Sequence, residues 1–216
     1  MKSRDAKIIL QTAYCTLAVI SMVASWGFFD MTFRDDFQVY FSNWSNYFCF
    51  GVMFVQLIQT VKNKENGYSD LIYLLKFIGL ISILITFFGY NFPDAERKPE
   101  WDYIINSVAF HVVLPITYII DWLLFFERRK LKWIYSVYAA ILPSIYSIFI
   151  FVRICILISV ARVQSFEVIL YPYFFFNIED LGFIGAIFMC TLIVFGYMLV
   201  GFIFIGLDRM VRVKCI

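Results

Sequence analysis

Long apolar runs alternate with short polar segments along the chain. A helix needs about 20 mostly apolar residues to cross the hydrocarbon core of a membrane, and six runs are long enough. They are Ile8–Phe29, Val39–Thr60, Leu71–Phe92, Tyr103–Phe126, Ile134–Ile158 and Phe183–Leu207. The runs are continuous rather than alternating, which excludes a membrane β-barrel. We therefore predict an all-α fold in which residues 1–216 form one domain of six transmembrane helices.

The second of these predicted spans is the least apolar. Six hydrogen-bonding side chains interrupt it: Ser42, Asn43, Ser45, Asn46, Gln56 and Gln59. Polar side chains of this kind commonly join neighbouring helices. They also mark functional sites, because a polar group inside a membrane is costly to keep.

Composition supports a membrane protein and excludes other classes. Hydrophobic residues make up 62% of the 216 positions and charged residues 16%, whereas soluble domains are about 45–50% apolar and about 25% charged. There is no basic arm or stripe that could follow a nucleic acid backbone, so we exclude that partner. With His111 as the single histidine, zinc sites of the HExxH type and bis-histidine haem are excluded. We predict neither a metal nor a cofactor.

The placement of Lys and Arg predicts the orientation. Four basic residues fall on one side of the predicted spans, namely Arg34, Arg97, Lys98 and Arg162. Twelve fall on the other, namely Lys2, Arg4, Lys7, Lys62, Lys64, Arg128, Arg129, Lys130, Lys132, Arg209, Arg212 and Lys214. Because cytoplasmic loops carry the excess of positive charge, we predict a multi-pass protein of the cell membrane with both termini inside. The span ends carry aromatic residues typical of interface anchors, namely Trp101, Tyr103, Trp133 and Tyr135.

Several polar groups fall towards the outer ends of different predicted spans. At about 1.5 Å per residue, His111 lies roughly 12 Å below the outer end of the fourth span. Arg153 lies about one and a half turns from the outer end of the fifth, and the loop that follows it carries Tyr171 and Tyr173. We expect these groups and the polar start of the second span to converge on one outward-facing cavity. Each also has a structural interpretation, as interhelical hydrogen-bonding, headgroup-seeking or belt residues.

Two further features concern the interior. Asp121 is roughly 15 Å deeper than His111 on the same helix, so we expect it to meet the inner basic turn or Lys76. Pro115 and Pro143 lie inside predicted spans, where a proline frees a backbone carbonyl and a kink can open a cavity.

The polar set permits nucleophilic chemistry. A hydroxyl that attacks an ester needs a base within hydrogen-bond reach, and His111 is the residue that titrates near neutrality. Ser42 or Ser45 can supply the hydroxyl, and Asn43, Asn46 or Arg153 can stabilise an oxyanion.

Three short motifs resemble a known family. The run Tyr40–Asn46 (YFSNWSN) resembles the YFTxxSN signature on the second span of a bacterial family of predicted six-span proteins. His111–Pro115, followed by Asp121 and Trp122, resembles that family's HxxxP…DW pattern, and Tyr171–Phe174 with Gly182 resembles its YPYxF…G element. The motifs occur in the family's order and at its span positions, so the resemblance covers most of the chain.

That family is similar, more distantly, to the animal androgen-induced and androgen-dependent membrane proteins. Those proteins hydrolyse fatty acid esters of hydroxy fatty acids with a threonine nucleophile and a histidine inside the membrane. The resemblance implies the same six-span fold, with Ser42 at the position of the threonine and His111 at that of the histidine. A serine there keeps the hydroxyl group.

Two functions follow as hypotheses. The first is a hydrolase of lipid-like esters among the membrane lipids, with Ser42 as nucleophile and His111 as base. Six polar neighbours would line the substrate or oxyanion site: Asn43, Ser45, Asn46, Arg153, Tyr171 and Tyr173. The alternative is a non-enzymatic transporter, sensor or partner subunit in which His111, Arg153 and Asp121 form a polar relay. The sequence lacks the inverted repeat and paired broken helices of transporters, whereas a charged Arg153 is hard to explain beside a neutral ester.

Overall fold

The computed structural model describes residues 4–28, 31, 36–62, 69–91, 108–127, 129–161 and 170–210, and every regular element in this part of the chain is helical. The α-helices are α1 (Arg4–Ser25), α2 (Phe41–Val61), α3 (Asp70–Asn91), α5 (Leu114–Phe125), α6 (Tyr135–Tyr138), α7 (Ile141–Ile156) and α8 (Ile178–Met210). Short 3-10 or π turns are η1 (Asp36–Val39), η2 (Ala109–Val113), η3 (Leu157–Ala161) and η4 (Phe174–Phe176). The predicted all-α fold is confirmed.

The length and apolar character of the helices indicate a membrane protein. Among the described residues, four helical segments are long and apolar enough to cross a membrane: Arg4–Ser25, Asp70–Asn91, Tyr135–Ser159 and Ile178–Met210. Ala109–Phe125 is a shorter apolar helix. The 21 residues of α2 are also long enough, but its polar side chains lower its hydropathy.

Each of the six predicted spans overlaps a helix among the described residues, and the differences at their ends have local causes. The last helix begins at Ile178 rather than Phe183 because the Asn177 side chain caps it. Its Oδ1 atom accepts hydrogen bonds from the backbone N–H groups of Glu179 and Asp180, at 3.0 and 3.3 Å. The first turn is then set off from the rest of α8 by Gly182, whose φ of +68° favours glycine.

Both intramembrane prolines lie at breaks in regular helix. Pro115 lies in the first turn of α5, directly after the π-helix η2. The Leu114 N–H donates to the Ala109 carbonyl, five residues earlier, so in this π register the missing N–H of Pro115 is the one that would face the Phe110 carbonyl. The Asn91 side chain donates to the neighbouring His111 carbonyl at 3.2 Å. In the same way, Pro143 follows the turn that separates α6 from α7.

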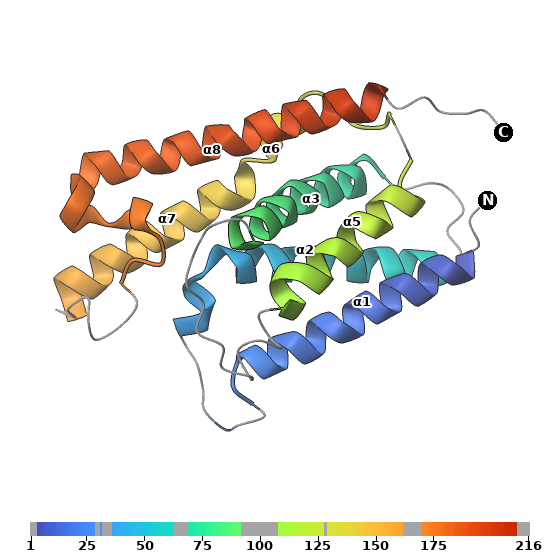
Figure 1. Ribbon diagram of the computed structural model, residues 1–216, viewed down its shortest axis with the longest axis horizontal. Coiled ribbons are helices and arrows are strands. Elements are labelled where there is room, and N and C mark those ends of the chain that lie inside the picture. Colours follow the sequence, from blue (N-terminus) through green and yellow to red (C-terminus); the bar gives the residue numbers. More distant parts are fainter. Residues whose placement is uncertain are drawn as a thin grey trace.

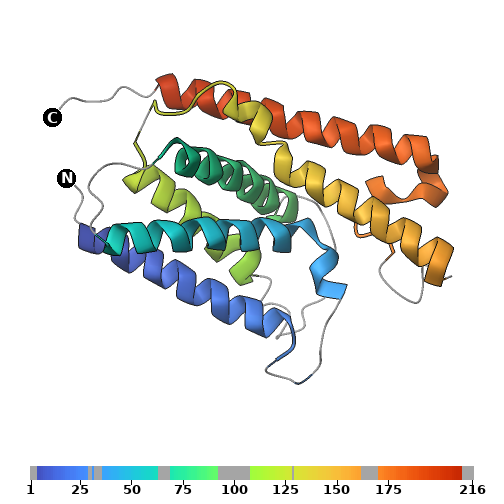
Figure 2. The same cartoon turned by 180° about the vertical axis from the view of Figure 1, so that it is seen from behind.

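Figures 1 and 2 show how the helices are grouped. Helix α2 packs along both α1 and α3, and α5 packs against α1 and α3, so these four helices form one bundle. Helices α7 and α8 run beside the bundle, and α6 contacts both α3 and α8. The hydrophobic core runs through all of these helices.

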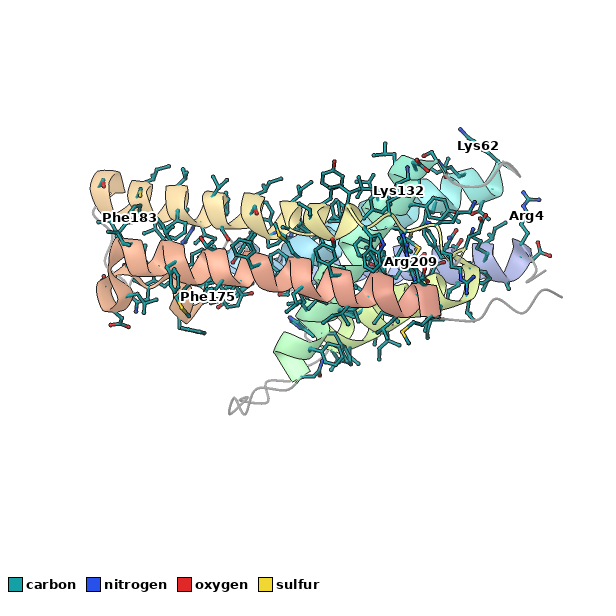
Figure 3. The ribbon with its side chains drawn as sticks, turned by 90° about the horizontal axis from the view of Figure 1, so that it is seen from above. Arg4, Lys62, Lys132, Phe175, Phe183 and Arg209 are labelled. Carbon is teal, nitrogen blue, oxygen red and sulfur yellow. The ribbon has the colours of Figure 1, made fainter. Side chains whose placement is uncertain are left out.

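The bundle has two chemically different ends. At one, which we call the basic end, Arg4 donates to the Thr60 and Val61 carbonyls at the end of α2, at 3.1 and 2.7 Å. Lys132 pairs with Asp70 at the start of α3 at the same end. The other, the aromatic end, holds the starts of α2 and α5 and the end of α3. Figure 3 shows Arg4, Lys62, Lys132 and Arg209 towards the first end and Phe175 and Phe183 towards the other.

Only some of the residues predicted at the span ends belong to the part of the chain that the structure describes. Trp133 lies under the Arg209 guanidinium, 4.6 Å from the ring centroid, at the basic end where it is expected. Trp101 and Tyr103 lie outside the described residues, and so do the four basic residues predicted for the opposite side: Arg34, Arg97, Lys98 and Arg162.

Candidate functional site

One side chain joins the start of α2 to the turn that carries His111. The Asn46 amide nitrogen donates to the carbonyl of Ser42, at 2.7 Å, and to the carbonyl of Phe110, at 3.0 Å. Phe110 and His111 are adjacent in η2. Because Asn46 is fully buried, this double contact holds the first turn of α2 against η2. The structure thus brings together the segments of Ser42, Asn46 and His111.

The ring of His111 has a defined plane. It stacks on the ring of Tyr90 from α3, with centroids 3.7 Å apart and an interplanar angle of 11°. The Asn91 side chain holds the carbonyl of the same histidine. Stacking fixes the imidazole face, so its two nitrogens act in the ring plane. A π-helical turn such as η2 occurs frequently at functional sites.

The two candidate hydroxyl groups have different surroundings. Ser45 is fully buried, and its hydroxyl lies 2.8 Å from that of Thr86 and 2.9 Å from the Ser42 carbonyl. Ser45 therefore has the ordinary role of joining α2 to α3. Ser42 is only half-buried and lies in the first turn of α2, where the helix dipole favours negative charge. Of the two side chains, that of Ser42 is the more accessible.

Tyr173 reaches the same turn from the loop before α8. Its hydroxyl oxygen accepts a hydrogen bond from the backbone N–H of Phe41, at 3.1 Å. Burial raises the pKa of Tyr173 to about 12, although the bond from Phe41 opposes this. The phenol thus keeps its proton at neutral pH and can act as a donor beside Ser42. Tyr146 donates to the Val39 carbonyl, two residues before Phe41, at 2.6 Å.

The hydrogen bond between Phe41 and Tyr173 can be tested by measuring the stability of a variant that lacks it. The Tyr173→Phe variant is expected to lower the free energy of unfolding by about 0.5–1.5 kcal/mol, because one hydrogen bond to the first turn of α2 is lost. Unfolding by SDS in mixed micelles measures the change. Tyr138→Phe is the control, since that side chain is exposed on α6, and an equal loss in both variants would contradict the contact.

Three other predicted site residues lie on different segments: Arg153 in α7, Tyr171 in the loop before η4, and Asn43 in α2. Arg153 donates to the Leu170 carbonyl at 3.3 Å. Tyr171 donates to the Glu179 carboxylate at 3.3 Å. Burial, and then the nearby Glu179 charge, raise the pKa of Tyr171 to about 12. Asn43 is almost fully buried in α2, with its N–H on the Tyr40 carbonyl.

Asp121 pairs with Lys76, which is one of the two partners that the sequence predicted for it. Its Oδ2 atom lies 2.7 Å from Nζ of Lys76, and both side chains are buried, with 1% and 0% exposed. Its Oδ1 atom accepts from the Gln11 amide at 3.2 Å. Asp121, His111 and Arg153 thus each contact different groups.

Three residues of this region were missed by sequence reasoning. Thr86 contacts Ser45, Tyr90 stacks on His111, and Asn91 bonds to the His111 carbonyl. A signal was present: Ser82, Thr86 and Tyr90 recur every four residues in a helix that is otherwise strongly apolar, which places them on one face.

The comparisons with known proteins add no relative. No family model, no curated protein and no solved structure matches the chain. Chemically, the site offers a half-buried hydroxyl at a helix start, an oriented imidazole and a neutral phenol donor.

Proposed function

We propose that the chain hydrolyses lipid-like esters at the aromatic end, with Ser42 as nucleophile and His111 as general base. The observation that carries this proposal is the double hydrogen bond of Asn46, which holds the Ser42 turn against the π-helix of His111. The motif resemblance names the same two residues. Asp121 is held by Lys76 and Gln11 in the interior of the bundle, which gives it a role apart from the relay, and we therefore favour the hydrolase.

The proposal includes the placement of the protein in the cell membrane. Six spans cross the bilayer, with both termini in the cytoplasm and the site near the outer leaflet. The gathering of cations at the basic end supports this orientation, because positive charge is retained on the cytoplasmic side (Figure 3). A substrate of the type of a fatty acid ester of a hydroxy fatty acid would enter from the surrounding membrane lipids.

The chemistry assigns one role to each group. The Ser42 hydroxyl oxygen forms a bond to the acyl carbon while His111 takes its proton. The carbonyl oxygen becomes an oxyanion, which the Tyr173 hydroxyl and the positive start of α2 stabilise. When the carbon–oxygen bond of the ester breaks, His111 gives the proton to the leaving alcohol. Water, deprotonated by His111, then releases the acid from Ser42. Asn46 positions Ser42 and His111 and does not touch the reacting atoms.

Labelling with a lipid-like fluorophosphonate tests this assignment. We expect the purified protein to be labelled, and Ser42→Ala and His111→Ala to lose the label while keeping the elution profile and helical spectrum of the native protein. Ser147→Ala is the matched control, because the Ser147 hydroxyl makes an ordinary bond within α7, to the Pro143 carbonyl. Undiminished labelling of both site variants would remove the proposal. Mass spectrometry that finds the label on Ser45 would move the nucleophile one turn along α2.

A further inference from the structure

A line of polar groups runs through the interior from the aromatic end to the basic end. Three contacts fix the antiparallel register of α2 and α3. Lys76 Nζ lies 3.6 Å from Met53 Sδ, and the Cys49 thiol lies 3.4 Å from the Gly79 carbonyl. Nearer the aromatic end is the contact between Ser45 and Thr86. We call the two facing helix surfaces the α2–α3 seam; its members are Ser42, Ser45, Asn46, Cys49, Met53, Gln56 and Thr60 of α2, and Lys76, Gly79, Ser82, Thr86 and Tyr90 of α3.

The spacing along the seam is close to one helical turn. On α2, polar or sulfur-bearing side chains follow one another every three or four residues. At about 5.4 Å per turn, two such groups are separated by a distance that one water molecule can bridge, since each of its hydrogen bonds is about 2.8 Å long. An uninterrupted succession of this kind is unusual in a lipid-immersed bundle, where apolar packing is the less costly choice.

Half of the seam is already joined by hydrogen bonds. From the basic end, the Thr60 hydroxyl donates to the Gln11 side chain at 3.2 Å, and the Gln11 amide donates to Asp121. Asp121 pairs with Lys76. These four residues come from four different helices. They connect a fully buried ammonium group to the end of α2, where Arg4 covers the Thr60 carbonyl.

Buried polar atoms that lack a hydrogen bond lie in and beside both halves of the seam. Among the described residues, Asn46 Oδ1, Ser82 Oγ, the Tyr14 hydroxyl and both amide atoms of Gln56 are buried without a hydrogen bond. Ser82 lies between Gly79 and Thr86 on α3, as Asn46 lies between Cys49 and Ser45 on α2, so the first two of these atoms occupy the same level. A buried polar group without a hydrogen bond is strongly unfavourable, and water satisfies such groups in proteins.

The ion pair itself argues for a use beyond stability. Among the described residues, the strong partner of Lys76 is Asp121; the ammonium group also contacts the Met53 sulfur and the face of Tyr118, 3.7 Å from the ring centroid. Replacing a buried ion pair by apolar residues is often neutral or stabilising. A protonatable pair that is kept inside a membrane is by default a functional site, and proton relays are a common use.

We propose that the α2–α3 seam conducts protons across the membrane, with the Lys76–Asp121 pair as its central exchange site. A proton moves from Lys76 Nζ to Asp121 Oδ2, which leaves both groups neutral. Asp121 then gives this proton to a water molecule beside Gln11 and Gln56. Lys76 takes up another proton from a water molecule beside Asn46 and Ser82. The other titratable side chains packed around the pair are Tyr14, Cys15, Cys49 and Tyr118. This activity is independent of ester hydrolysis and uses the six-span placement proposed above.

Proton flux into liposomes tests the proposal. The full chain is placed in liposomes loaded with potassium and pyranine, and valinomycin sets a negative potential inside. We expect the lumen to acidify faster than in protein-free liposomes. The double variant Lys76→Met/Asp121→Leu and the variant Ser82→Ala are expected to fall to the protein-free rate. Asp70→Asn and Ser147→Ala should keep the native rate, because Asp70 and Lys132 form an exposed ion pair, and Ser147 lies on α7 away from the seam.

The variants separate conduction from folding and from hydrolysis. Within the described residues the Ser82 hydroxyl makes no hydrogen bond, so its removal breaks no contact between helices, and a merely structural seam predicts unchanged flux in Ser82→Ala. The double variant should retain fluorophosphonate labelling, which distinguishes a failure of this proposal from a failure of the hydrolase. Acidification no faster than in protein-free liposomes would overturn conduction, and native flux in the double variant would overturn the Lys76–Asp121 pair as its exchange site. Native flux in Ser82→Ala would overturn the seam as its route.

Discussion

Replacing Asp121 by asparagine is expected to lower the free energy of unfolding by about 3–5 kcal/mol, because it leaves the Lys76 ammonium buried without its counter-charge. Lys76→Met should lower the free energy of unfolding by a similar amount, because it leaves the Asp121 carboxylate buried without its counter-charge. Neither group can turn to solvent, as the exposed fractions of 0% and 1% show. Unfolding by SDS in mixed micelles measures both changes.

The double variant shows whether the fold is stabilised by the ion pair itself or is only destabilised when one of the two buried charges is left unpaired. Lys76→Met/Asp121→Leu is expected to recover most of the loss, because two apolar side chains remove the charges together and fill a similar volume. Asp70→Asn is the matched control: it breaks another Lys–Asp pair of α3, but Asp70 and Lys132 are 76% and 56% exposed, and surface pairs contribute little. A double variant as unstable as the two single variants combined would show that the pair stabilises the bundle by itself.

The sequence predicted the helices well because apolar length is a local property. Span two matched α2 to within two residues at each end, and span three matched α3 to within one. The last predicted span starts at Phe183, directly after the non-helical Gly182, where the uninterrupted part of α8 begins. The short helical turn before it, which Asn177 caps, was not predicted because it lies outside the apolar run.

The contacts between helices were harder to predict from one sequence. Helical spacing shows which residues share a face, but the rotation and register of two helices come from packing over their whole length. Asp121 was therefore assigned two alternative partners, and the structure shows that Lys76 is one. For Tyr90 the ring stack on His111 depends on where the end of α3 meets η2, which no spacing rule gives.

The orientation of the protein in the membrane was predicted from the distribution of Lys and Arg. The four basic residues predicted for the outer side are outside the described residues, so the six-span, cytoplasmic-termini arrangement remains a prediction. Within the described residues, its support is the cluster of cations at the basic end (Figure 3). The sequence predicted that the polar side chains of Ser42, Asn46 and Tyr173 lie in the same region of the protein. Their individual hydrogen bonds could be seen only in the structure.

Gly79→Ala is expected to destabilise the bundle by about 1–3 kcal/mol, because it adds a methyl group where no space exists. A Cβ atom at Gly79 would lie 2.5 Å from the Tyr118 hydroxyl oxygen and 3.1 Å from the Cys49 sulfur. Tyr118 cannot yield easily. It is fully buried, and its ring lies against the Lys76 ammonium group. Any displacement would therefore disturb the buried ion pair as well.

Gly51→Ala supplies the control for this prediction, since a Cβ atom at Gly51 would meet nothing within 4 Å. An alanine in a helix interior is otherwise favoured by about 0.5–1 kcal/mol over glycine, so the two variants should move in opposite directions. Adding Tyr118→Phe to Gly79→Ala removes the clashing oxygen and should restore part of the loss in a double-mutant cycle. If Gly79→Ala were as stable as Gly51→Ala, the close approach of α3 and α5 at this level would be wrong. The position of Tyr118 beside Lys76 would then be wrong with it.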